Sequence, residues 1–220
     1  MAIPDGLSFD ELNKLYEEEH DGDLRSMPFE QFFGEMDLSP RQKKQRIETA
    51  NELRAFMRLA IMEMYYGMYE GDYGEYDPSA TIRDNYQALL DRLGIPLTAF
   101  FAATHVGTVS TEIPLSTMTH SDDPYFFSED RARLIAENEA NSIWNDSEFQ
   151  DAILTGKSRK QWSAIIDKRT RSTHRDANGM VVAITEPFEV GDSFLMYPRD
   201  TSLGASADEI VNCRCSVTYY

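Results

Sequence analysis

Hydrophobic residues recur every three or four positions through much of the first 156 residues, the spacing of amphipathic helices. A capping-box pattern begins at Ser8, and Ser39 followed by Pro40 supplies an N-cap and a proline for the first helical position. Gly94 and Gly156 are placed to end later helices. The pattern predicts helices over residues 9–20, 40–70, 82–93 and 128–156, with an exposed turn over residues 70–79. On or near one side of the last helix lie Leu134, Ile135, Trp144, Phe149, Ile153 and Leu154.

The predicted helix over residues 40–70 is apolar on two sides. One face is a core-facing stripe made of Ile47, Ala50, Leu53, Met57, Ile61, Met64 and Met68. A second stripe lies on nearly the opposite side of the later half and consists of Ala55, Leu59, Met62 and Tyr66. A helix with two apolar sides needs two partners. Either helices of the same chain cover both sides, or one Met-rich face docks on another subunit.

After residue 156 the pattern changes to short runs rich in β-branched and aromatic residues, separated by Gly, Pro, Asp and Asn. Such runs predict a small antiparallel sheet, whose last strand would take in the terminal run EIVNCRCSVTYY. The Thr-, Ser- and Pro-rich residues 106–127 predict an extended linker. We therefore expect an α+β protein with an acidic helical region over residues 1–105, this linker, and a domain of one helix and a small antiparallel sheet over residues 128–220.

The two cysteines of the chain, Cys213 and Cys215, lie in the last predicted strand. Because strand side chains alternate, both sulfurs would face the same side. Three interpretations stay open: small apolar core residues, ligands of a zinc ion, or redox-active thiols. Zinc would need more ligands, and the candidates are His174 for the third, and Asp167, Asp176 or water for the fourth. A disulfide between the two cysteines would close a small, strained ring.

The densest polar cluster is the run DKRTRSTHRDANG, which begins at Asp167. A hairpin loop whose charges brace neighbouring segments would explain it. Alternatively, Asp167 and His174 orient each other for acid–base chemistry. The cations of the run are candidates for contact with a phosphate group or DNA, and they are Lys168, Arg169, Arg171 and Arg175.

The formal net charge of −17 is concentrated before residue 157. That acidic part should repel nucleic acid, whereas residues 157–176 carry seven Lys or Arg against two Asp. This basic segment is either a solvated loop that offsets nearby acidic helices or a contact surface. The chain has no run of 18 apolar residues and its start lacks a signal-peptide pattern, so we expect a protein made in the cytosol that does not enter a membrane.

Taken together, these residues resemble a known family. In order along the chain they are Trp162, Asp167-Lys168-Arg169-Thr170-Arg171-Ser172-Thr173-His174, Gly179, Pro187-Phe188, Met196-Tyr197-Pro198 and Asn212-Cys213-Arg214-Cys215. Their order and spacing resemble the carboxyl-terminal domain of the Mu-F-like phage head morphogenesis proteins, which are minor capsid proteins of tailed bacteriophages. Two positions differ from the family pattern: Glu137 stands where an arginine is expected, and Asn178-Gly179 replaces a common Asp-Gly turn.

The resemblance implies a structural protein inside the virion, assembled in the host cytoplasm and bound to the portal protein or other capsid proteins. It would aid head assembly, DNA packaging or DNA delivery, with residues 157–176 facing packaged DNA or the portal. The family's His and Cys positions suggest zinc at His174, Cys213 and Cys215. Related domains also occur beside toxin modules. The alternative function is therefore a metal-dependent hydrolase or nuclease, a toxin-like effector that uses His174, Asp167 and the two cysteines.

Overall fold

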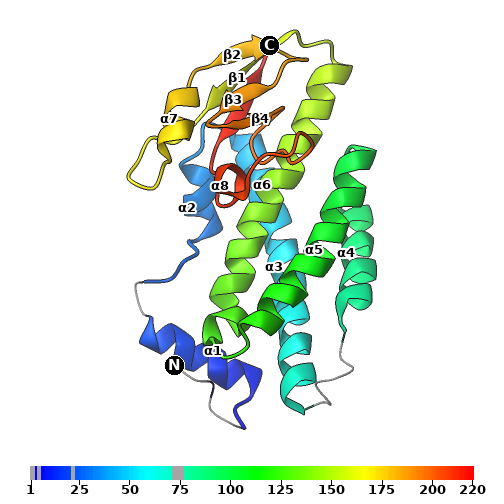
Figure 1. The fold of residues 1–220 in the computed structure, drawn as a ribbon, viewed down its shortest axis with the longest axis vertical. Helices are drawn as coiled ribbons and strands as arrows, with labels where there is room; N and C mark the ends of the chain where they lie inside the picture. Colours follow the sequence, from blue (N-terminus) through cyan, green and yellow to red (C-terminus); the bar gives the residue numbers. More distant parts are fainter. Residues whose placement is uncertain (1–2, 4–5, 21–22, 71–76) are drawn as a thin grey trace. The chain divides into compact units, whose positions relative to one another are not determined.

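The fold is an α+β arrangement, as the sequence predicts, and it is described here from a computed structural model over residues 3, 6–20, 23–70 and 77–220 (Figure 1). Most of the predicted turn over residues 70–79 lies outside the described residues. The elements in chain order are α1 Phe9–Glu19, α2 Phe29–Gly34, α3 Pro40–Glu70, α4 Ser79–Leu93, α5 Ala99–Thr119, η1 Pro124–Phe127, α6 Glu129–Leu154, β1 Arg159–Ser163, α7 Ser172–Ala177, β2 Val181–Ala183, β3 Phe188–Val190, β4 Ser193–Leu195, α8 Ala207–Ile210 and β5 Ser216–Tyr219.

The chain forms two compact units, and α3, α5 and α6 contribute residues to both. Unit 1 comprises Met1–Met27, Ala50–Gly94 and Ala103–Ala136, and unit 2 comprises Pro28–Thr49, Ile95–Ala102 and Glu137–Tyr220. Among the described residues, no helix combines the length and the apolar character that a membrane span requires. A separate domain over residues 128–220 stays a prediction.

Three helix ends that the sequence predicts are confirmed by the structure. Ser8 caps α1 and forms the predicted capping box with Glu11. Helix α3 begins at Pro40, directly after Ser39, and α4 ends at Gly94, which adopts the left-handed conformation with φ 61°. These ends were predictable because each depends on a local side-chain or glycine effect.

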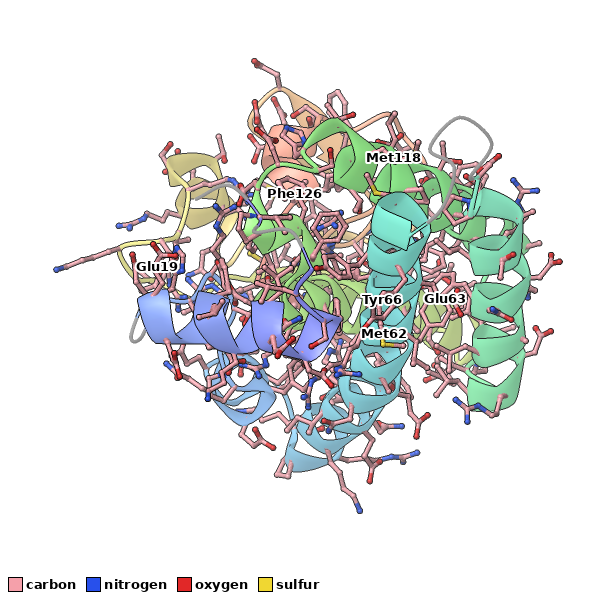
Figure 2. The ribbon with its side chains drawn as sticks, turned by 90° about the horizontal axis from the view of Figure 1, so that it is seen from below. Glu19, Met62, Glu63, Tyr66, Met118 and Phe126 are labelled. Carbon is pink, nitrogen blue, oxygen red and sulfur yellow. The ribbon has the colours of Figure 1, made fainter. Side chains whose placement is uncertain are left out.

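The two apolar faces of α3 differ in burial. On the first face Leu53, Met57 and Ile61 are fully buried residues of unit 1, whereas Ile47 belongs to unit 2 and is only half-buried. On the second face Leu59 is 52% exposed, and Met62 and Tyr66 are half-buried. Figure 2 shows Met62 and Tyr66 on α3, with α1 to one side of the helix and α4 to the other. The described residues therefore do not cover the second face completely, and docking of another subunit there stays a prediction.

The extended linker predicted over residues 106–127 is wrong, because α5 continues to Thr119 and η1 follows. The helix contains Pro114 and many hydroxyl residues, and two contacts account for the hydroxyl of Thr117. Thr117 Oγ1 donates to the carbonyl of Ile113, four residues back, at 2.7 Å. The buried guanidinium of Arg131 also donates to that carbonyl and to Thr117 Oγ1, and burial lowers the pKa of Arg131 to about 10. A tertiary contact thus overrides the local preference.

Unit 2 contains a three-stranded antiparallel sheet in the order β2-β1-β5 and a separate β3–β4 hairpin. Trp162 pairs with Val217 in the sheet and packs in one buried cluster with Phe188 and Leu195. The segment between β1 and β2 was predicted as a plain hairpin loop, but it contains α7. The last predicted strand is also too long: its first residues form α8, and β5 begins only at Ser216.

We expect the two faces of α3 to respond differently to the same substitution. Leu53→Ala should lower the free energy of unfolding by about 2–5 kcal/mol, because it opens a cavity in a packed core. Leu59→Ala should change it by about 0.5 kcal/mol or less, because the side chain is half in solvent. Urea titration of both variants measures the difference. Equal losses, or a loss at Leu59 that grows with protein concentration, would show that the second face is buried.

Candidate metal centre

One imidazole and two sulfurs meet in the interior of unit 2. His174 on α7 places Nδ1 3.6 Å from Cys213 Sγ and 3.3 Å from Cys215 Sγ. The three side chains lie within 4.8 Å of one another through their potential ligand atoms, and each residue is at most 2% exposed. The predicted meeting of His174 with the cysteine pair is therefore found in the structure. The reason is different from the one expected, since neither cysteine lies in a strand.

Residues 212–215 form a turn, and side chains of α6 hold it. Asn212 has a positive φ of 55°, a conformation that Asn adopts more readily than most residues. Its side-chain oxygen accepts from Asn138 Nδ2 at 2.9 Å, and the carbonyl of Cys213 accepts from Asn141 Nδ2 at 3.2 Å. These contacts turn both sulfurs toward α7.

Arg214, between the two cysteines, joins this turn to the polar cluster. Its Nη2 donates to both oxygens of Asp167, each at 2.7 Å, and its Nη1 donates to Glu35 at 3.0 Å. Partial burial would raise the pKa of Asp167, but hydrogen bonds from Arg214, Thr170 and the backbone of Arg169 outweigh it and lower the pKa to about 2. Asp167 is thus held by Arg214. It does not belong to the group formed by His174, Cys213 and Cys215, which we call the His–Cys group.

Glu209 on α8 orients the imidazole and was missed in the sequence. Its Oε2 lies 2.9 Å from His174 Nε2 and accepts from Thr173 Oγ1 at 2.9 Å. A hydrogen on Nε2 leaves the lone pair of Nδ1 facing the sulfurs. Gly191, with φ 58°, gives the carboxylate room, since a Cβ there would lie 2.6 Å from Glu209 Oε1. The sequence signal that could have identified Glu209 is its position four residues before Cys213.

Trp162 forms a wall of the centre. It is 1% exposed and packs edge-on against the His174 ring, with ring centroids 5.8 Å apart. Among the described residues its buried indole N–H has no hydrogen-bond partner, although Trp162 acts against the rise in the pKa of the Cys215 thiol. A thiolate at Cys215 would accept a hydrogen bond from this N–H more readily than a thiol does.

The two sulfurs differ in protonation. Burial would raise the pKa of Cys213, but hydrogen bonds with Cys215 and His174 bring it well below its usual range. The hydrogen bond with Cys213, together with burial, raises the pKa of Cys215. For His174, burial would lower the pKa, and the hydrogen bond and charge of Cys213 raise it. Of the two sulfurs, Cys213 is therefore the one more readily deprotonated.

A small cavity adjoins the three side chains. Its volume is about 20 Å³, and His174, Cys213 and Cys215 line it together with Arg169 and Arg171. A space of this size holds about one water molecule. The larger cavities of unit 2, of about 360 and 530 Å³, are lined by other residues.

Three of the four predicted phosphate- or DNA-binding cations contact groups of the protein itself. Arg169 pairs with Glu35 at 3.5 Å, Arg171 donates to the carbonyl of Val211, and Arg175 donates to the carbonyl of Thr170 at 3.1 Å. Lys168, Arg169 and Arg175 are nevertheless exposed, whereas Arg171 is half-buried. A contact of these residues with DNA stays a prediction.

Comparison with known proteins gives the family. A family model described as Phage Mu protein F like protein matches residues 107–218, which is half of the chain. The chain belongs to this family. The match confirms the resemblance seen in the motifs, and it extends into α5, where the sequence had predicted a linker.

The chain is also 34% identical over 90 residues to the NAD(+)–arginine ADP-ribosyltransferase EFV of Enterococcus faecalis. The matched part is 39% of this chain and 18% of that relative, so the chain spans less than a fifth of the relative's length. No solved structure matches the chain.

We expect the Asp167–Arg214 pair to make stability depend on acid pH. The pKa of Asp167 in the folded protein, about 2, lies below its ordinary 3.8, so its contribution is present above pH 4 and is lost as pH falls from 4 to 2. Asp167→Asn should therefore lower the free energy of unfolding at pH 7 by about 1 kcal/mol, after discounting for solvent screening. The difference from wild type should shrink toward pH 2.

Urea titrations across this pH range measure the effect. Asp176→Asn is the matched control, because Asp176 is an exposed carboxylate on α7 and its substitution should change stability little at any pH. A wild-type to Asp167→Asn difference that stays constant down to pH 2 would contradict the role assigned to the ion pair.

Proposed function

We propose that the protein is a minor head protein that acts inside the phage head, binds the portal protein, and aids head assembly, DNA packaging or DNA delivery. The observation that carries this proposal is the family match over residues 107–218. The acidic amino-terminal two-thirds of the chain suits contact with protein rather than with nucleic acid, because phosphate groups are bound chiefly by Lys and Arg.

The geometry of the His–Cys group supports a structural role rather than catalysis. A catalytic group must reach its substrate within about 3 Å. His174, Cys213 and Cys215 are at most 2% exposed, and the adjoining cavity of about 20 Å³ is far too small for a nucleotide. Asp167, the fourth residue of the hydrolase or nuclease alternative, is held by Arg214. No observation favours that alternative.

The likeness to the ADP-ribosyltransferase supports a shared module and no more. Less than a fifth of that protein's length is matched, and the family model that covers half of this chain describes a phage protein. We therefore propose no transfer of ADP-ribose by this chain.

The proposal predicts where the protein is found. Heads purified from the phage that carries this gene should contain the chain in a few copies, protected from added protease. Co-expression with the portal protein should recover both in one complex. A phage with a nonsense mutation in the gene should produce fewer infectious particles, and supplying the chain in trans should restore them. Absence of the chain from purified heads would overturn the proposal.

The proposed contact with packaged DNA predicts a salt-dependent effect of one exposed cation. Lys168→Ala should weaken binding to duplex DNA of any sequence and reduce the slope of log affinity against log salt by about 1. Lys44→Ala is the matched control, since Lys44 is an exposed lysine on α3 that pairs with Glu48. Equal effects of both substitutions, or no binding by wild type, would remove residues 157–176 as a DNA contact.

A further inference from the structure

We propose that His174 Nδ1, Cys213 Sγ and Cys215 Sγ bind one zinc ion as a structural centre, with the fourth coordination position occupied by a water-sized ligand in the adjoining cavity. The inference rests on side-chain geometry and is independent of the function proposed above. It assigns the same three residues that the sequence suggested, and it adds Glu209 and Trp162 as residues that position the ligands.

The distances between ligand atoms fit a tetrahedral ion. With zinc bonds of about 2.3 Å to sulfur and 2.0–2.1 Å to nitrogen, a sulfur and a nitrogen ligand lie about 3.6 Å apart. The observed separations from His174 Nδ1 are 3.6 Å to Cys213 Sγ and 3.3 Å to Cys215 Sγ. All three atoms lie within 4.8 Å of one another, so a zinc ion needs only small side-chain adjustments.

The hydrogen bond of Glu209 to His174 matches what a metal-bound histidine requires. A ligating imidazole normally donates its other N–H to a carboxylate or carbonyl, which fixes the tautomer and the plane of the ring. Glu209 occupies this position at 2.9 Å from Nε2, and Thr173 holds the carboxylate in turn. Trp162 packs against the His174 ring, and its buried indole N–H, which has no hydrogen-bond partner among the described residues, would donate to a thiolate of a zinc site.

Charge balance favours a divalent ion in this interior. Two thiolates and one zinc ion sum to zero, so the loaded centre buries no net charge, and burying net charge is costly. The donor set also selects the metal. Magnesium and calcium prefer oxygen ligands, and an iron–sulfur cluster takes four cysteines, whereas two sulfurs and one nitrogen in a tetrahedron suit zinc.

The fourth ligand is not a carboxylate of the loop. Asp167, the expected candidate, gives both oxygens to Arg214, and Asp176 is exposed on the solvent side of α7. Neither belongs to the group of ligand atoms found among the described residues. The cavity of about 20 Å³ lined by all three ligands holds one water molecule and excludes larger substrates.

The test begins with the full-length chain, purified without a chelator and without a histidine tag. Elemental analysis should find about one zinc per chain. Cys213→Ser, Cys215→Ser and His174→Ala should each reduce zinc to less than about a tenth of that amount. His120→Ala is the matched control, since His120 is an exposed histidine of unit 1, and it should retain full zinc. Wild-type protein with far less than one zinc per chain would overturn the proposal.

A second measurement applies if the ligand variants do not fold. Glu209→Gln removes the carboxylate charge but keeps the side-chain shape, and it should weaken zinc binding about 10–100-fold in competition with a chelator of known affinity. In wild type, both thiols should resist a thiol reagent until a chelator is added, and cobalt in place of zinc should show thiolate-to-metal absorption. Unchanged affinity in Glu209→Gln, or thiols unaffected by the chelator, would contradict the site.

Discussion

The structure of unit 2 depends on the buried polar face of α6. The segment from β4 to β5 has little regular structure, so its backbone groups cannot all pair within a sheet, and each buried group left unpaired costs about 1–3 kcal/mol. Helix α6 supplies partners: Asn145 Nδ2 donates to the carbonyl of Pro198 at 3.1 Å, and Asn141 donates to that of Cys213. Asp146 accepts from Tyr197 OH at 2.8 Å. The polar side chains of α6 thus supply hydrogen bonds that strands of a sheet would otherwise supply to this segment.

The same face explains where charge is buried. Arg46 of α3 is fully buried and donates to both oxygens of Glu148 and to Asn145, all on α6. A buried guanidinium is tolerated only when its donors are paired, and α6 satisfies it with one carboxylate and neighbouring amides. The helix therefore fixes the start of α3 and the turn at residues 212–215 with adjacent side chains. The His–Cys group depends on this scaffold, because Asn141 and Asn138 set the turn that carries both sulfurs.

Features that depend on adjacent residues were easier to predict from the sequence than features that depend on contacts between distant residues. Helix ends at Ser8, Pro40 and Gly94 depend on adjacent residues and were found. The apolar pattern of α6 did not predict which of its residues are buried, since Ile153 and Leu154 are exposed while asparagines of the same helix are buried. A hydropathy pattern cannot show which distant backbone groups an Asn will bind. Helix α5 was missed because its Pro, Ser and Thr residues favour an extended segment locally, whereas the contacts that Arg131 makes with Ile113, Ser116 and Thr117 depend on the fold. For the site, the pairing of His174 with the cysteines was predictable from residue types, whereas Glu209 required the fold of α8.

The position of Arg214 links the buried centre to the surface of unit 2. Because Cys213 and Cys215 face inward, the residue between them faces outward, and there it holds Asp167 at the start of the basic loop. Asp167 in turn accepts from Thr170 Oγ1 and from the backbone of Arg169, so the exposed cations of the loop are positioned through the same turn that positions the sulfurs. An ion bound by the sulfurs cannot touch a partner protein or DNA. It can act on either only by fixing this turn, so its effect would be on the geometry of the loop, as expected of a structural metal.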